Sequence, residues 1–280
     1  MATTSETETI WFENRPSEGW LPRLNLRELW FYRRLGYQLA VRDLKVRYKQ
    51  TFFGVAWAVL QPVLAAIIFS VVFGSLADVP SDGLPYPVFV YAGLTAWIYI
   101  STSVDAAARS LVEDRELVTK VYFPRLLAPF AALLPGVLDL AISLVILAIL
   151  MIGYGVAPDL ALLTLPLWVA ALVLVALGAG LWLSALNALY RDVRYALSFG
   201  IQLWLFISPV VFPSSLVDDE WRYLFALNPV AGAIDGFRWA TIDGPPPGTE
   251  DLVSLAVAVL LLVSGAVYFR RTERVLADRI

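Results

Sequence analysis

The side chains that most often carry out chemistry in proteins are scarce in this chain. Its 280 residues contain no His and no Cys. The chain therefore lacks the commonest general base and the commonest metal ligand, and it has no thiol nucleophile, disulfide framework or Cys-metal site. A Ser-His-Asp triad and an H-E-x-x-H zinc motif are both excluded. We expect no catalytic residue and no metal site in this chain.

A phosphate-binding loop is also missing. The three lysines are Lys45, Lys49 and Lys120, and none of them lies in a G-x-x-x-x-G-K-[ST] context, in which backbone N–H groups cradle nucleotide phosphates. If ATP drives this protein, a separate chain binds it. We therefore expect no cofactor here, with ATP and Mg on a partner subunit, and a translocation pathway instead of a catalyst. We expect no nucleic-acid partner.

Carboxylates are the remaining candidates for a polar site. Asp139 lies in a long apolar run with Pro129 and Pro135-Gly136. An ionisable residue this deep is costly and usually faces a bundle interior or water, so Asp139 marks a pathway or caps backbone N–H groups that the prolines free. No basic partner for it is visible within the apolar runs. The acidic run Asp218-Asp219-Glu220 is either a solvated loop or weak support for a membrane-embedded enzyme.

Long apolar runs make up most of the chain. Hydrophobic residues account for 59% of it, and the mean hydropathy is +0.69. Each run is near the ~20 residues that an α-helix needs to cross a hydrocarbon core about 30 Å thick. The sequence predicts an all-α integral membrane protein with six transmembrane helices. The six predicted spans are 52–77, 87–108, 126–153, 160–189, 196–213 and 251–269.

Basic residues are distributed very unevenly about these spans. Of 21 Lys and Arg residues, only Arg222 and Arg238 fall on one side of the six-span topology. Because positive loops stay in the cytoplasm, we expect a multi-pass protein of the plasma (inner) membrane with both termini cytoplasmic. The predicted parts are a cytoplasmic tail at 1–24, an amphipathic interface helix at 25–50 and a transmembrane domain at 51–280.

Two cytoplasmic segments carry the charges that a partner protein would meet. In the first, Tyr37, Ala40, Val41, Leu44 and Tyr48 recur at helical spacing among basic residues, which is typical of a helix on the membrane surface. It acts as an anchor alone, or also as a docking face for a cytoplasmic subunit. The second segment, 105–125, is a charged connector or a lever that a motor subunit pushes.

Several polar and aromatic residues are candidates for a channel lining. Gln61 precedes Pro62 in the first span, where it satisfies backbone groups or faces a polar lumen. Aromatic residues cluster after the first outside loop, and they form an interfacial belt or stack on sugar rings in a pore. This group comprises Tyr86, Phe89, Tyr91, Trp97 and Tyr99.

The long outside stretch at 213–250 is too apolar for an ordinary loop and too interrupted for two spans. Asn228-Pro229 marks a turn between two short helices. We expect a re-entrant or interfacial helical hairpin, since irregular backbone at membrane depth is tolerated when protein buries it. Arg238 is expected to snorkel to the outer headgroups, or alternatively to contact an anionic substrate.

Four segments together resemble the membrane subunit of ABC-2 type polysaccharide exporters, the group that exports O-antigen, teichoic acid and capsule. They are YQLAVRDLKVRYKQTFFGVAWAVLQPVL (37–64), KVYFPR (120–125), YRDVRY (190–195) and LNPVAGAIDGFR (227–238). The first is the most specific, and the four extend across nearly the whole membrane part. The resemblance does not cover the N-terminal tail.

The resemblance implies a homodimer with two copies of a separate ATP-binding subunit, together forming a channel for a lipid-linked glycan. The implied contacts with the ATPase are Arg42, Asp43, Lys45, Arg47, Arg109, Glu113, Asp114, Arg115 and Glu116. The channel would use Gln61, Tyr86, Phe89, Tyr91, Trp97, Tyr99 and Asp139. The exit hairpin would use Arg222, Asn228, Pro229 and Arg238. Two alternatives stay open: an ABC-2 type exporter of drugs or antibiotics, and a membrane-embedded glycosyltransferase or lipid-modifying enzyme.

Overall fold

The chain folds into α-helices, as the sequence predicts. The computed structural model describes residues 26–49, 56–120 and 123–279, and no β-strand occurs in those ranges. Near the N-terminus lie α1 (Leu26–Phe31), α2 (Arg33–Lys49), α3 (Ala56–Phe69) and its π-helical continuation η1 (Ser70–Leu76). The middle comprises α4 (Tyr86–Glu113), α5 (Arg115–Lys120), α6 (Leu127–Tyr154), η2 (Leu160–Thr164) and α7 (Leu165–Leu189). The rest is α8 (Val193–Phe206), η3 (Ser214–Leu216), α9 (Asp219–Phe225), α10 (Pro229–Ile242) and α11 (Thr249–Arg279).

Within the described ranges, five helical segments are long and apolar enough to cross a membrane. They are Val59–Leu76, Tyr86–Glu113, Leu127–Tyr154, Leu160–Leu189 and Thr249–Glu273. Each coincides with one of the predicted spans. The sixth prediction, 196–213, is not confirmed, because α8 has 14 residues, which is about 21 Å at 1.5 Å per residue. The Ser208-Pro209 step that follows disfavours continued helix.

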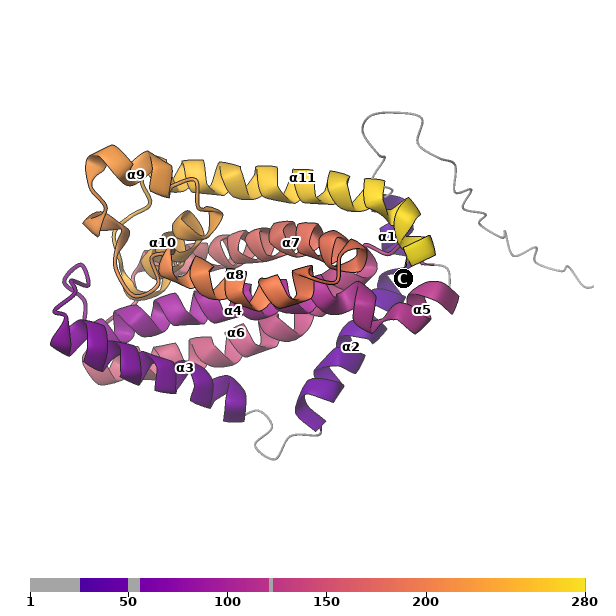
Figure 1. Ribbon diagram of the computed structural model, residues 1–280. Helices are drawn as coiled ribbons and strands as arrows, with labels where there is room; N and C mark the ends of the chain where they lie inside the picture. The colour runs from indigo at the N-terminus through magenta and orange to yellow at the C-terminus, as the bar shows by residue number, and fades with distance from the viewer. Residues whose placement is uncertain (1–25, 50–55, 121–122, 280) are drawn as a thin grey trace, which may run out of the picture.

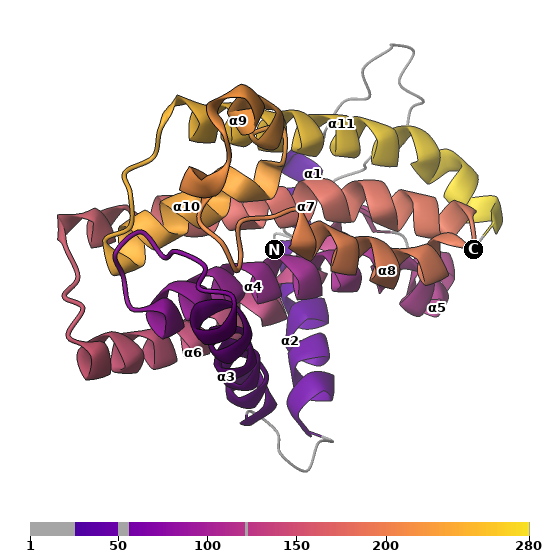
Figure 2. The same cartoon turned by 60° about the vertical axis from the view of Figure 1, so that its left-hand side comes forward.

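The centre of the bundle is α4, which packs against α6, α7 and α10 (Figures 1 and 2). Val88, Ala96, Ile100 and Val104 on this helix are fully buried. On the far side of α7, α11 crosses at two glycines. A Cβ on Gly178 would lie 2.8 Å from the backbone nitrogen of Leu262, and one on Gly265 would lie 2.8 Å from the carbonyl oxygen of Gly178. Small residues thus permit the close helix contact that apolar membrane bundles rely on.

The elements separate into two ends, as the charge distribution predicts. At the basic end lie α1, α5, the turn 190–192 and the last turns of α11 (Figure 1). At the hairpin end lie the loop 77–85, η3, α9, α10 and the start of α11. Which end faces the cytoplasm stays a prediction from the charges.

The predicted interface helix differs in two ways from the observed one. It is divided at Tyr32 into α1 and α2, while residues 25 and 50 lie outside the described ranges. Its buried face consists of Gly36, Leu39 and Ala40, which packs on α6 and not on lipid alone. Tyr37, the first residue of the predicted apolar stripe, is 68% exposed and lies outside this buried face.

Candidate functional site

The two charged segments predicted to meet an ATPase contact each other at the basic end. Arg42 on α2 forms ion pairs at 2.7 Å with Asp43 and with Asp114, which caps the end of α4. The hydrogen bond to Asp114 raises the pKa of Arg42, while burial raises the pKa of Asp43. A salt bridge thus joins the interface helix to the connector, which the sequence placed 72 residues away.

The other docking candidates lie around this junction. Arg109 pairs with Asp105 one helical turn earlier at 2.9 Å, and Glu116 pairs with Lys120 at 3.1 Å. Lys45, Glu113 and Arg115 have exposed side chains. Because solvent screens such pairs, they add little to stability. Contact of these charges with a partner protein stays a prediction.

Asp139 has a basic partner that the sequence did not reveal. Its carboxylate pairs with Arg47 at 2.8 Å and accepts a hydrogen bond from the hydroxyl of Tyr48. Both partners lie in the last turn of α2, so the end of the interface helix is tied to the middle third of α6. No basic partner was expected within the apolar runs, and Arg47 lies outside them, on α2. The signal that could have found the pair is the basic Arg47-Tyr48-Lys49 end of α2, which precedes the first span.

Four aromatic candidates for the channel lie inside the protomer. Phe89, Tyr91 and Tyr99 are almost fully buried, and Trp97 is 5% exposed. Side chains enclosed between α4 and its neighbours cannot line a channel that forms between two copies, nor can they form an interfacial belt. These assignments do not hold for a channel between copies, because α6, α7 and α10 pack around α4 and enclose its side chains. Of the other candidates, Gln61 is exposed on α3, and Tyr86 donates a hydrogen bond to the carbonyl oxygen of Val211 at 2.7 Å.

Several helices present large apolar side chains outward, among them α8, α3 with η1, α6 and α11. On α8, Leu197 is buried while Phe199, Leu203 and Phe206 are exposed. On α3 and η1 the exposed side chains include Leu60, Leu64, Ile67, Ile68, Val71 and Val72. Apolar faces of this extent are covered by lipid or by another chain.

The stretch predicted to form a hairpin contains η3, α9 and α10. Asn228 holds the turn between the two helices, because its side chain accepts a hydrogen bond from the backbone N–H of Val230 at 3.1 Å and caps α10. The same amide accepts from the indole N–H of Trp204 at 2.9 Å, and Pro229 follows at the first helical position. The predicted turn at Asn228-Pro229 is therefore confirmed, and it is tied to the end of α8.

Arg238 does not snorkel from this hairpin. Its side chain is buried, and it donates hydrogen bonds at 2.6 Å to the carbonyl oxygens of Pro209 and Val210. The guanidinium carbon lies 3.7 Å from the centroid of the Phe89 ring. Gly93 leaves the necessary space, since a Cβ there would lie 2.3 Å from Nη2 of Arg238. The expected headgroup contact is wrong, because the free carbonyls around Pro209 bind the guanidinium instead.

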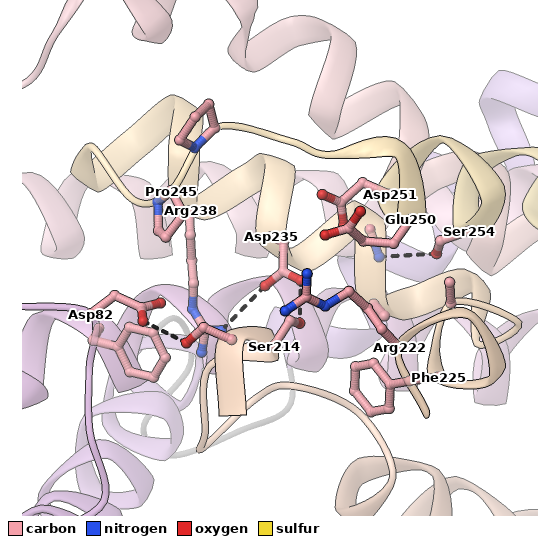
Figure 3. A pocket seen from close by; sticks show the side chains of 16 residues that line it. Asp82, Ser214, Arg222, Phe225, Asp235, Arg238, Pro245, Glu250, Asp251 and Ser254 are labelled. Atoms are coloured by element: carbon pink, nitrogen blue, oxygen red, sulfur yellow. Dashed lines mark hydrogen bonds and ion pairs between the residues drawn. The ribbon is translucent and has the colours of Figure 1, made fainter. Parts of the chain in front are cut away.

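Arg222, the other basic residue of the hairpin, lies at its surface. It pairs with Asp219 at 2.8 Å, three residues earlier on α9. Its side chain is partly exposed and reaches the edge of a cavity at the hairpin end (Figure 3). The two basic residues of the hairpin therefore have different roles: Arg238 holds the hairpin to the loop after α8, and Arg222 is accessible.

Comparison with known proteins places the whole arrangement in one family. The ABC-2 type transporter family matches residues 35–242, about three quarters of the chain, from α2 to the end of α10. This chain belongs to the ABC-2 type transporter family. The family resemblance drawn from the sequence motifs is thereby confirmed.

Relatives of this ABC-2 protein align along most of their own lengths. The O-antigen export system permease protein RfbA of Myxococcus xanthus is 31% identical over 259 residues, which cover 91% of this chain and 98% of the relative. A protein of the same name from Klebsiella pneumoniae is 25% identical over 83% of this chain and 89% of its own length. The polysialic acid transport protein KpsM of Escherichia coli is 23% identical over 86% of this chain and 94% of its own length.

Proposed function

We propose that this chain is the permease of an ATP-driven exporter that moves a lipid-linked polysaccharide out of the cytoplasm across the inner membrane. The observation that carries the proposal is the alignment with permeases named for O-antigen export, which extends over 91% of the chain at 31% identity. The cargo class comes from those names. The direction comes from the basic end, which the positive-inside rule assigns to the cytoplasm.

The proposed motor is a pair of separate ATP-binding subunits that carry ATP and Mg. They would dock at the basic end, where the Arg42–Asp114 ion pair joins α2 to the end of α4. A push on this junction has two rigid routes into the membrane: α4 itself, and the Arg47–Asp139 contact to α6. Packed helices respond to such a push by small rotations or shifts and not by gradual deformation.

The proposed channel forms between two copies of the chain. The exposed apolar faces of α3 and α8 replace the buried aromatic residues of α4 as its candidate walls. Gln61 lies on the α3 face and adds a polar group there. A mostly apolar wall suits a moving glycan, because such a wall offers few hydrogen bonds that would hold the glycan at one position. The hairpin end would be the exit.

Reconstitution with a candidate ATPase tests the proposal. The pair of proteins is placed in lipid vesicles, and ATP hydrolysis is measured with and without lipid-linked glycans. We expect hydrolysis to rise when a suitable glycan is present. Hydrolysis that responds to a hydrophobic drug and to no glycan would contradict the proposed cargo and favour a drug exporter.

A further inference from the structure

A small cavity lined by both polar and apolar groups opens at the hairpin end, where segments far apart in the sequence converge. Its volume is about 240 Å³, below the roughly 300–1,000 Å³ typical of sites for drug-sized ligands. The loop 77–85 contributes Asp82, η3 contributes Ser214 and Ser215, α10 contributes Asp235, and the start of α11 contributes Glu250 and Asp251. Figure 3 shows these side chains around one space. The cavity is of a size to hold a single sugar unit.

Its carboxylates are fixed in place and still have acceptor capacity. The hydroxyl of Ser215 donates to one oxygen of Asp82 at 2.7 Å, and the backbone N–H of Gly248 donates to one oxygen of Asp251 at 2.8 Å. Among the described residues, the second oxygen of each has no protein donor. A carboxylate has two oxygens that each accept hydrogen bonds. Fixed acceptors of this kind suit the hydroxyl or amino groups of a sugar.

Arg238 and Phe225 complete the lining of the cavity. Arg238 lines the cavity and is only 2% exposed, and its Nε has no hydrogen-bond partner in the described part of the chain. Such an unsatisfied buried donor is costly to the fold. The ring of Phe225 also lines the space and offers an apolar face beside the polar groups, the usual composition of a small-molecule site.

The charge of the cavity selects among sugars. Four carboxyl groups line it against two guanidinium groups. Asp235 forms an ion pair with Arg238 at 3.8 Å, Arg238 is also bound to two carbonyl oxygens, and Arg222 is paired with Asp219. Among the described residues, the charges of Asp82, Glu250 and Asp251 therefore have no paired cation. A carboxylated sugar would meet like charges without a free cation to offset them. The hydroxyl groups of a neutral sugar can donate hydrogen bonds to the carboxylates of the cavity. The ammonium group of an amino sugar meets carboxylates of opposite charge.

We propose that this cavity binds one neutral or amino sugar unit of the exported glycan at the hairpin end and rejects acidic sugars. The inference rests on the proposed function for its cargo and adds the chemical class of that cargo. It separates this chain's expected substrate from polymers of acidic sugars.

Binding of small glycosides to the purified full chain tests the inference. The probes are the methyl glycosides of glucose, glucosamine and glucuronic acid, and saturation-transfer NMR reports their contact with the protein. We expect transfer to the glucoside and the glucosaminide and none to the glucuronide. Equal transfer to all three, or transfer to the glucuronide alone, would overturn the proposal.

Two variants place the binding in the cavity. In Asp82→Asn the amide keeps the acceptor for Ser215, and Asn tolerates the left-handed backbone at φ 53°, so the loop should keep its shape. We expect the affinity for the glucosaminide to fall about tenfold. Adding Glu250→Gln should raise the glucuronide signal relative to the glucoside, a gain that misfolding cannot produce. Glu220→Gln is the matched control, because Glu220 is exposed on α9 outside the cavity. It should change neither the affinity for the glucosaminide nor the ratio of the glucuronide signal to the glucoside signal.

Transport separates a failure of this inference from a failure of the proposed function. If glycoside binding is absent or unaffected by Asp82→Asn while ATP-dependent glycan transport persists, the cavity is not a sugar site and the exporter assignment stands. If no glycan is transported under any condition, the exporter assignment itself fails. The binding measurement thus tests the sugar site, and the transport measurement tests the exporter assignment.

Discussion

At the scale of single residues, polar side chains in this protein find their partners across long sequence separations. Arg238 binds the carbonyl oxygens of Pro209 and Val210, and Asp139 binds Arg47 and Tyr48. In both cases the sequence shows an ionisable residue in an apolar setting and correctly indicates that it is special. It cannot show the partner, because the partner is brought close only by helix packing. Burial of a charge without such a partner would be prohibitive.

The fit of Arg238 against Gly93 yields a prediction for stability. In Gly93→Ala, the new Cβ would lie 2.3 Å from Nη2 of Arg238 and 2.6 Å from the carbonyl oxygen of Val210. Since both groups are buried and hydrogen-bonded to each other, we expect a loss of roughly 1–3 kcal/mol, seen as a lower Tm in detergent. Gly153→Ala is the control, because no atom lies within 4 Å of its Cβ position. Equal Tm values for the two variants would contradict the packing described.

Asp235 yields a prediction for pH dependence. Burial raises the pKa of this hairpin carboxyl to about 7, against the opposing effects of Arg238 and Ser214. In the unfolded chain the group ionises near its ordinary value of 3.8, so between about pH 4 and pH 7 the folded state holds the extra proton and stability falls as pH rises. We expect the difference in Tm between the parent and Asp235→Asn to change steadily over this window. A difference that stays constant with pH would show that Asp235 titrates normally.

At the scale of elements, hydropathy alone predicts five of the membrane-spanning helices. It does not predict where a helix ends within an apolar run, or which side chains neighbouring helices bury. The run 196–213 has the composition of a span, yet the helix within it ends at Phe206, before Pro209. The aromatic residues of α4 were expected at a surface because aromatic residues gather there. They are buried because α4 is surrounded by other helices, a property of the assembled bundle that no single segment encodes.

The junction of α2 with the end of α4 yields a prediction for coupling. Arg42→Glu places like charges at the contact with Asp114 and Asp43, so we expect glycan-stimulated ATP hydrolysis by the complex to fall severalfold. Adding Asp114→Arg to the Arg42→Glu variant restores opposite charges at the contact, and it should recover most of the lost ATP hydrolysis.

Lys45→Glu is the comparison for this experiment. It makes the same change of charge at an exposed position on the same helix, and Asp114→Arg should not rescue it. Rescue of both variants to the same extent would point to a general charge effect and against a specific junction.

At the scale of the whole molecule, the separation of a basic end from a hairpin end follows directly from the sequence. The surface that two copies would share does not, because the exposed α8 face was read as one more lipid-crossing helix. Since the chain has no native Cys, single Cys substitutions give a clean test. We expect Phe199→Cys on α8 to form a disulfide-linked dimer on oxidation in membranes, and Ile152→Cys, which is 81% exposed at the end of α6, to remain monomeric. The reverse pattern would move the shared surface to α6.

The measurement that tests the central claim most directly is transport itself. The permease and its ATPase are reconstituted into vesicles with the basic end outward, and a labelled lipid-linked glycan is followed from the outer to the inner leaflet. The account predicts that the glycan becomes protected inside the vesicles only when ATP is hydrolysed and only when the permease is present. Hydrolysis without any movement of the glycan, or movement that is equal without ATP, would contradict it.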